Sequence, residues 1–76
     1  MRDLVLWLAG ELVEHKGAVR VEAIERDRST VLELTVDPGD LGRVIGRGGR
    51  TAKAMRTVLD AAARRQGRRV VLDLLD

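Results

Sequence analysis

The sequence predicts an α+β fold in the order α-β-β-α-α-β, with a three-stranded sheet covered on one face by three helices. Segments 3–15 and 50–66 carry apolar residues at the spacing of a helix. Three shorter segments alternate apolar and polar residues, which is typical of half-buried strands. A chain of 76 residues has room for one hydrophobic core, so we expect residues 1–76 to form a single domain.

Residues 3–15 form the first predicted helix. Its apolar stripe recurs every three or four residues and comprises Leu4, Val5, Leu8, Ala9, Leu12 and Val13. Lys16 suits the last turn, and Gly17 is expected to end the helix. Trp7 lies on the opposite side of the helix from the stripe. We therefore expect Trp7 to be exposed, and either to fold over a neighbouring element or to contact another subunit.

Two strands joined by a hairpin follow this helix. Asp27 and Arg28 indicate the turn between them. The apolar positions of the two strands are Val19, Val21 and Ala23, and then Leu32, Leu34 and Val36.

A second helix is expected to start in the segment Asp37-Pro38-Gly39-Asp40. Asp37 suits the N-cap, Pro38 suits the first helical position, and Asp40 favours the positive end of the helix dipole. The glycines from Gly46 onward stop this helix. Its short apolar face consists of Leu41, Val44 and Ile45.

A longer helix from about Arg50 to Gln66 and a final strand complete the predicted fold. Gly67 is expected to close the helix. The buried stripe of the helix is Ala52, Met55, Leu59, Ala62 and Ala63, and the strand alternates at Val70, Leu72 and Leu74.

The composition excludes several classes of protein. The absence of cysteine argues against a disulfide-rich secreted domain and excludes a cysteine-based zinc site. His15 is the only histidine, so a His-based metal site is not expected. The apolar run 4–9 is too short to span a bilayer and lacks the flanks of a signal peptide. We expect a cytoplasmic protein that needs neither a membrane nor a cofactor.

The net charge of +2 hides a strong asymmetry along the chain. Residues 1–41 contain nine acidic and five basic side chains, whereas residues 42–69 contain nine basic side chains and one acidic one. A segment with that charge attracts polyanions even in a nearly neutral chain, although a solvated basic helix face has the same pattern.

The most informative segment is the glycine-rich turn between the two predicted helices, Gly46-Arg47-Gly48-Gly49. Glycine lets the backbone bend sharply and lets another backbone come close. The N–H groups at the start of the following helix have no partner within that helix and lie at the positive end of its dipole, which suits a phosphate oxygen. The charges beside the turn belong to Arg47 and Arg50, and further along the same helix face lie Lys53, Thr57 and Arg64.

Two better-known glycine motifs do not fit this segment. The phosphate loop of nucleotide hydrolases requires Gly-Lys-Ser/Thr and an earlier glycine, but this chain has Arg50 and Val44 at those positions. The dinucleotide fingerprint requires Gly or Ala where this chain has Thr51, and no strand leads into the turn.

The segment Ile45-Gly46-Arg47-Gly48-Gly49-Arg50-Thr51-Ala52 resembles the Ile-Gly-x-x-Gly signature of KH domains, and the element order resembles their type II arrangement. The whole chain is similar to the KhpA family of small bacterial RNA-binding proteins. This resemblance implies that the loop grips the backbone of about four unpaired nucleotides and that the bases turn toward an apolar groove. The residues that we expect to bind RNA are Arg43, Ile45, Gly46, Arg47, Gly48, Gly49, Arg50, Thr51 and Lys53.

The resemblance also implies a role as an RNA chaperone or post-transcriptional regulator, connected with cell elongation and envelope homeostasis. It implies a homodimer, or a heterodimer with a larger KH-containing RNA-binding protein. The alternative is a KH-fold interaction module that dimerises without binding RNA, which an exposed Trp7 favours.

An enzyme is not expected, because the sequence has no nucleophile with a base, no metal cluster and no spaced pair of acids. His15 at a helix end suits a surface or capping position. Asp60 is expected to pair with Arg56 or Arg64, each four residues away in the same helix.

Overall fold

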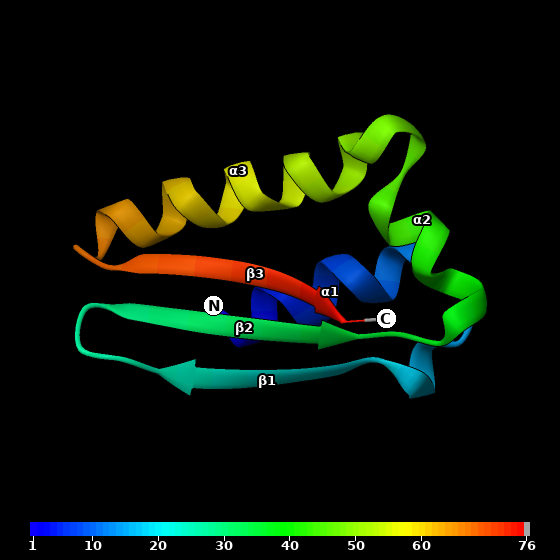
Figure 1. The fold of residues 1–76 in the computed structure, drawn as a ribbon, viewed down its shortest axis with the longest axis horizontal. Coiled ribbons are helices and arrows are strands. Elements are labelled where there is room, and N and C mark those ends of the chain that lie inside the picture. The colour runs from blue at the N-terminus through cyan, green and yellow to red at the C-terminus, as the bar shows by residue number, and fades with distance from the viewer. Residues whose placement is uncertain (76) are drawn as a thin grey trace.

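The computed structural model describes residues 1–75 and confirms the predicted element order (Figure 1). The three α-helices are α1 (Arg2–Leu12), α2 (Leu41–Ile45) and α3 (Arg50–Arg65), and the three strands are β1 (Arg20–Glu25), β2 (Ser29–Thr35) and β3 (Arg69–Leu75). Short 3₁₀ turns join them at η1 (Lys16–Ala18), η2 (Pro38–Asp40) and η3 (Arg47–Gly49).

The sheet has the strand order β1-β2-β3. β1 and β2 are antiparallel and joined by the predicted hairpin, whereas β2 and β3 are parallel. A parallel pair requires a crossover connection, and α2, the glycine turn and α3 supply it. The turn therefore lies at one end of the molecule, and α3 runs back over the sheet to the other end (Figure 1).

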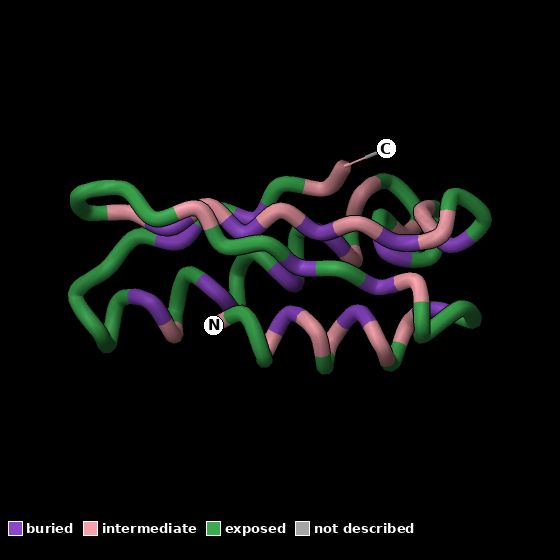
Figure 2. The backbone as a smooth tube through the Cα atoms, turned by 90° about the horizontal axis from the view of Figure 1, so that it is seen from below, coloured by how far each residue is buried: buried purple, intermediate pink, exposed green. Residues whose placement is uncertain are grey.

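The core lies between the sheet and the long helices. Figure 2 shows the strands along one side of the molecule and helices along the other. The inward positions of the helices and strands alternate with exposed ones, as the periodicity predicted. The main members of the core are Val5 and Ala9 of α1, Val21, Leu32, Leu34 and Leu72 of the sheet, and Met55, Leu59 and Ala63 of α3. Ala23 is exposed and Ala62 is half-buried, so both contribute less than the pattern predicted.

The expected end of the first helix at Gly17 is wrong. α1 ends at Leu12, and Gly17 lies in the separate turn η1. The N–H of Val13 still donates to the Ala9 carbonyl. The N–H groups of Glu14 and His15, which follow it, donate to the Asp40 carboxylate instead of continuing the helix. The Lys16 ammonium still stabilises the end of α1, because it donates to the carbonyls of Gly10 and Val13.

The other predicted boundaries are close to those observed. Asp37 caps η2 by accepting from the Gly39 N–H at 2.9 Å. At the end of α3, the N–H groups of Gly67 and Arg68 return to the carbonyls of Arg64 and Ala63, with Gly67 at a φ of 67°. This is a Schellman closure, which requires the left-handed conformation that glycine adopts without strain.

Candidate nucleic-acid interface

The turn between α2 and α3 depends on three glycines in conformations that other residues avoid. Gly46, Gly48 and Gly49 have φ values of 77°, 63° and 76°. Gly46 also packs against the first turn of α3: a Cβ atom there would lie 2.7 Å from the Thr51 Cβ and 2.9 Å from the Thr51 N. An added Cβ at Gly48 or Gly49 meets nothing within 4 Å. The turn is thus closed at Gly46 and open to solvent at Gly48 and Gly49.

The first turn of α3 is capped only in part: the Arg50 N–H donates to the Arg47 carbonyl, which leaves the N–H groups of the following residues for an anion. Its N-cap is Gly49, which has no side chain that could accept a hydrogen bond from the first N–H groups of the helix. These groups lie at the positive end of a dipole built by 16 residues. The start of α3 has the local geometry of a phosphate-binding site.

Three basic side chains surround this helix start without partners of opposite charge. Arg47, Arg50 and Lys53 are all exposed, and within residues 1–75 none of them forms an ion pair. Their charges are therefore uncompensated by near neighbours, and they extend from the turn along one face of α3.

Arg43 differs from the other basic candidates. Its guanidinium contacts the Glu14 carboxylate and lies 3.6 Å from an Asp40 oxygen. Much of its charge is thus compensated, and it ties α2 to the segment that follows α1. Of the four basic candidate residues, Arg43 has the least uncompensated charge to offer a ligand.

The short apolar face of α2 is divided between the core and the surface. Val44 is fully buried and Leu41 is half-buried against the core, whereas Ile45 is 37% exposed. Of the three residues on this face, Ile45 has the most accessible side chain. Thr51, the other uncharged candidate side chain, is half-buried against Gly46.

Two hollows lie on the exposed side of α3 next to the turn. One, of about 500 Å³, is lined by Arg50, Lys53, Ala54, Thr57 and Val58. The other, of about 390 Å³, lies between α1 and α3 and is lined by Trp7, Leu8, Glu11, Leu12, Thr51, Ala54, Met55 and Val58. Trp7 is 63% exposed, which confirms the prediction that it lies outside the core.

The outer face of the sheet carries the opposite charge. Glu22, Glu33 and Asp73 are opposite one another on β1, β2 and β3, on the side away from the helices. Three carboxylates in one row repel a polyanion. A polyanion would therefore meet less repulsion on the helical side of the molecule than on this face.

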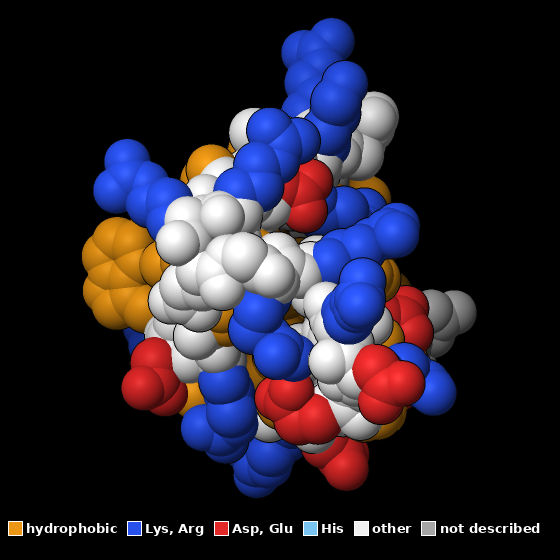
Figure 3. Space-filling model, turned by 90° about the vertical axis from the view of Figure 1, so that its left-hand side faces the viewer, with side chains coloured by type: hydrophobic (Ala, Val, Ile, Leu, Met, Phe, Trp, Pro, Cys, Tyr) orange, Lys and Arg blue, Asp and Glu red, His pale blue; other side chains and the backbone are white. Residues whose placement is uncertain are grey.

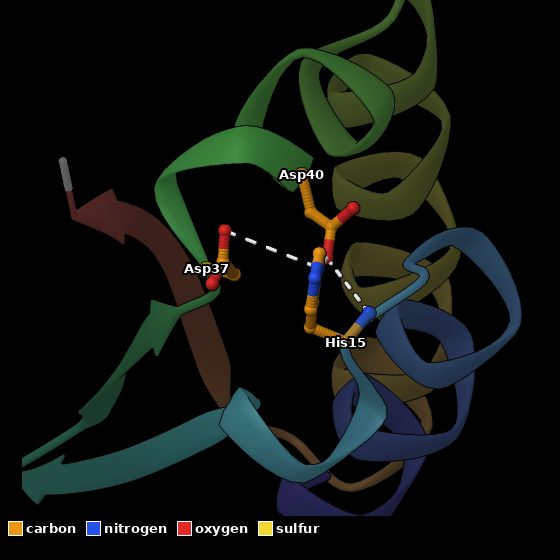
Figure 4. Close-up of side chains that lie close together, drawn as sticks. All are labelled: His15, Asp37 and Asp40. Carbon is orange, nitrogen blue, oxygen red and sulfur yellow. Dashed lines mark hydrogen bonds and ion pairs between the residues drawn. The ribbon is translucent and has the colours of Figure 1, made fainter.

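His15, Asp37 and Asp40 meet beside the start of α2 (Figure 4). Their potential ligand atoms lie within 4.8 Å of one another, although sequence reasoning had set aside a His-containing cluster because the chain has a single histidine. Both oxygens of Asp40 already accept backbone N–H groups, and His15 Nδ1 lies 3.0 Å from Asp40 Oδ2. The cluster therefore links the end of α1 to the start of α2.

These contacts shift the pKa values of both partners. The hydrogen bond to Asp40, with the nearby Asp37 carboxylate, raises the pKa of His15 above its ordinary value. The backbone N–H of His15, followed by the imidazole and the Glu14 N–H, holds the pKa of Asp40 below its ordinary value against the effect of burial.

The predicted pairing of Asp60 within α3 is wrong. Neither Arg56 nor Arg64 forms an ion pair with Asp60 in the described part of the chain. The Arg56 guanidinium reaches across to the sheet instead and donates to the Leu72 carbonyl at 3.2 and 3.3 Å. No described helix is long and apolar enough to cross a membrane.

The fold and the glycine turn define a KH domain of the type II order. A family model described as KhpA/KhpB, KH domain, matches residues 2–74. The chain therefore belongs to the KhpA/KhpB KH-domain family, which is not a family of enzymes.

Curated relatives support the same assignment over the full length. The RNA-binding protein KhpA of Aquifex aeolicus is 50% identical over 76 residues, which cover 100% of this chain and 96% of that protein. KhpA of Halalkalibacterium halodurans is 50% identical with complete coverage of both chains. KhpA of Bacillus subtilis is 38% identical over 100% of this chain and 94% of that protein.

Proposed function

We propose that residues 1–76 act as one KH domain that binds single-stranded RNA at the turn between α2 and α3. The observation that carries this proposal is the combination of an open glycine turn, a start of α3 without a side-chain cap, and three cations that form no ion pair within residues 1–75. The relatives that are named RNA-binding proteins support it.

In this mechanism the RNA backbone lies across the turn. The N–H groups that follow Arg50 in the first turn of α3 and the exposed Gly48 contact phosphate oxygens, while Arg47, Arg50 and Lys53 neutralise their charge. Gly46 and Thr51 hold the turn in shape. Ile45 offers apolar surface to a base that points away from the backbone, and the grip covers about four nucleotides.

The sequence preference and affinity of such a site are modest. The chain contains no Phe or Tyr, so the aromatic stacking that strengthens many single-strand sites is absent at the turn. Most contacts are to phosphates, which carry no sequence information. This chemistry suits a broadly acting RNA chaperone or post-transcriptional regulator in the cytoplasm, and family resemblance connects that role with cell elongation and the cell envelope.

A second subunit compensates for modest affinity. Two linked sites gain by effective concentration without any new contact to RNA. The apolar hollow around Trp7 and Val58 favours self-association or pairing with a larger KH protein, because both side chains are largely exposed. The same observation supports the alternative function, a dimerisation module without RNA binding.

Fluorescence anisotropy with a labelled single-stranded RNA tests the proposal against this alternative. We expect the chain to bind an unstructured 12-nucleotide RNA and to be displaced poorly by a perfect duplex of the same sequence. Because a KH grip requires splayed, unpaired bases, equal displacement by the duplex indicates charge attraction alone. Absence of binding by the folded protein leaves the dimerisation module as the function.

A further inference from the structure

The basic segment of the sequence does not form one surface in the structure. α3 separates it into two groups, one at the glycine turn and one at the opposite end of the molecule. Because each helical residue adds about 1.5 Å, the 16 residues of α3 hold these groups about 24 Å apart. The group at the turn is accounted for by the proposed RNA site, whereas the second group is not.

The second group gains members from another part of the chain. The hairpin between β1 and β2 reaches the same end, where the Arg69 N–H donates to the Arg28 carbonyl and the Arg68 guanidinium contacts Glu25 and Thr30. Figure 3 faces this end, where Lys and Arg side chains cover much of the upper part and part of the lower left, and acidic ones lie mainly in the lower half. We name this group the far-end arginine cluster; its members are Arg26, Arg28, Arg64, Arg65, Arg68 and Arg69.

The cluster is strongly charged and mostly uncompensated. Against its six arginines stand the three carboxylates of Glu25, Asp27 and Asp60, which leaves +3. Of the six arginines in the cluster, only Arg68 forms an ion pair within residues 1–75, with Glu25 at 2.9 Å. Bringing several unpaired like charges together opposes folding. A ligand of opposite charge removes that cost.

Helix capping explains only part of the cluster. Arg64 and Arg65 occupy the last turn of α3, where a positive charge favours the helix dipole. Arg26 and Arg28 belong to the hairpin, so the dipole of α3 gives no reason for them. Two stretches of the chain, 26–28 and 64–69, place arginine at one end of the molecule, which favours a shared ligand.

A shallow surface connects this end with the middle of α3. A hollow of about 290 Å³ is lined by Arg64, Arg68, Arg69 and Asp60 together with Ala63 and Val70. A second hollow of about 210 Å³ continues between α3 and β3 and includes Arg56, Asp60 and Arg69. Arginine side chains thus follow the edge between α3 and β3 from the far end toward the turn.

We propose that the far-end arginine cluster is a second, sequence-independent phosphate-binding surface for RNA that flanks the segment held at the glycine turn. The proposal rests on the proposed function and extends it: the RNA contact covers both ends of α3 rather than about four nucleotides. Arginine suits this task because its guanidinium forms paired hydrogen bonds with phosphate oxygens.

The test compares three RNAs and two sets of substitutions in the complete chain, each of which lowers the net charge by three. Arg26→Gln, Arg64→Gln and Arg65→Gln together remove three charges at the far end without breaking an ion pair. Gly17→Asp with Arg20→Asp makes the same change of three in net charge on the exposed surface of η1 and β1 and forms the matched control. Anisotropy is measured with a 5-nucleotide RNA, a 20-nucleotide unstructured RNA and a hairpin RNA with a 5-nucleotide tail, each over a salt series.

We expect the far-end variant to bind the 5-nucleotide RNA within about twofold of the wild type but the longer RNAs about tenfold more weakly at low salt. Its log-log salt slope on the unstructured RNA should fall by about 0.7 for each lost contact, or about 2 in total. A larger loss of affinity on the unstructured RNA identifies unpaired flanking RNA as the ligand. A larger loss on the tailed hairpin identifies paired flanking RNA instead.

Three results overturn the inference. Wild-type binding of the long RNAs by the far-end variant shows that the cluster makes no contact. An equal loss on the 5-nucleotide RNA, or an equal loss in the control variant, shows a general effect of net charge. Failure of the wild type to bind any RNA contradicts the proposed function as well. This result differs from the first two, because in both of those the wild type binds RNA.

Discussion

Gly46 and Thr51 are in such close contact that the turn before α3 has no room for a side chain at position 46. A Cβ atom there would lie 2.7 Å from the Thr51 Cβ, and the Gly46 backbone, at φ 77° and ψ 169°, is in a region that is essentially limited to glycine. The shape of the proposed phosphate site therefore depends on this pair.

Substitution at Gly46 should consequently destabilise the fold more than substitution at Gly48. Gly46→Ala combines backbone strain with a steric clash, and we expect a loss of more than about 2 kcal/mol. Gly48→Ala meets nothing within 4 Å, so only the strain of a left-handed residue, about 1 kcal/mol, remains. Urea unfolding followed by circular dichroism measures both. Equal losses in the two variants contradict the described contact with Thr51.

Substitutions at Val44 and Ile45 should show that stability and RNA binding depend on different residues of α2. Val44 is fully buried, so Val44→Ala should cost about 2 kcal/mol of unfolding free energy. Ile45→Ala should change stability by less than about 0.5 kcal/mol, because the side chain is 37% exposed, and should weaken RNA binding. Urea unfolding and RNA titration of the same samples provide the check. A normal RNA affinity for Ile45→Ala rules out the proposed contact with a base.

The hydrogen bond between His15 and Asp40 predicts a pH dependence of stability. The raised pKa of His15 gives a stabilising contribution that is complete below the unfolded value of about 6.5 and disappears as pH rises through the folded pKa. The lowered pKa of Asp40 acts in the opposite direction, since its contribution is present above about pH 4 and is lost in more acidic solution. Stability should therefore be higher at pH 6 than at pH 9.

Urea midpoints at pH 6 and pH 9 measure this effect, with His15→Gln as the control. His15→Gln should be less stable than the wild type at pH 6, and its urea midpoints at pH 6 and pH 9 should differ much less than those of the wild type. A difference that persists unchanged in His15→Gln shows that another group causes it.

The exposed Trp7 predicts self-association through the hollow between α1 and α3. Trp7→Ala should shift the protein toward the monomer in sedimentation at rising concentration, since large aromatic side chains dominate such interfaces. Val71→Ala is the matched control, because Val71 is an exposed apolar residue, 41% accessible, on the outer face of the sheet. The interface lies elsewhere if both variants sediment like the wild type.

Much of the fold follows from local patterns in the sequence. Alternation at Leu32 and Leu34 and helical spacing at Met55 and Leu59 each depend on neighbours within one element, so they predicted the buried faces correctly. The conformations of Gly46 and Gly67 follow from local backbone requirements in the same way.

The features that the sequence did not predict depend on distant contacts. α1 ends early because Asp40, about 25 residues away, takes the N–H groups of Glu14 and His15. Arg56 contacts the Leu72 carbonyl of β3 rather than Asp60 of its own helix. The far-end arginine cluster combines Arg64 of α3 with Arg28 of the hairpin, 36 residues earlier in the chain, a proximity that no local pattern contains.

The most direct test of the central claim is RNA binding by the Arg47→Asp, Gly48→Asp double variant. Asp tolerates the left-handed conformation better than most residues, and both positions are exposed, so the variant should fold. Gly17→Asp with Arg20→Asp makes the same change in net charge on an exposed surface far from the turn and is the control. Circular dichroism confirms that each protein is folded before labelled single-stranded RNA is titrated. The account predicts that the wild type and the control bind and the turn variant does not; equal binding by all three folded proteins contradicts it.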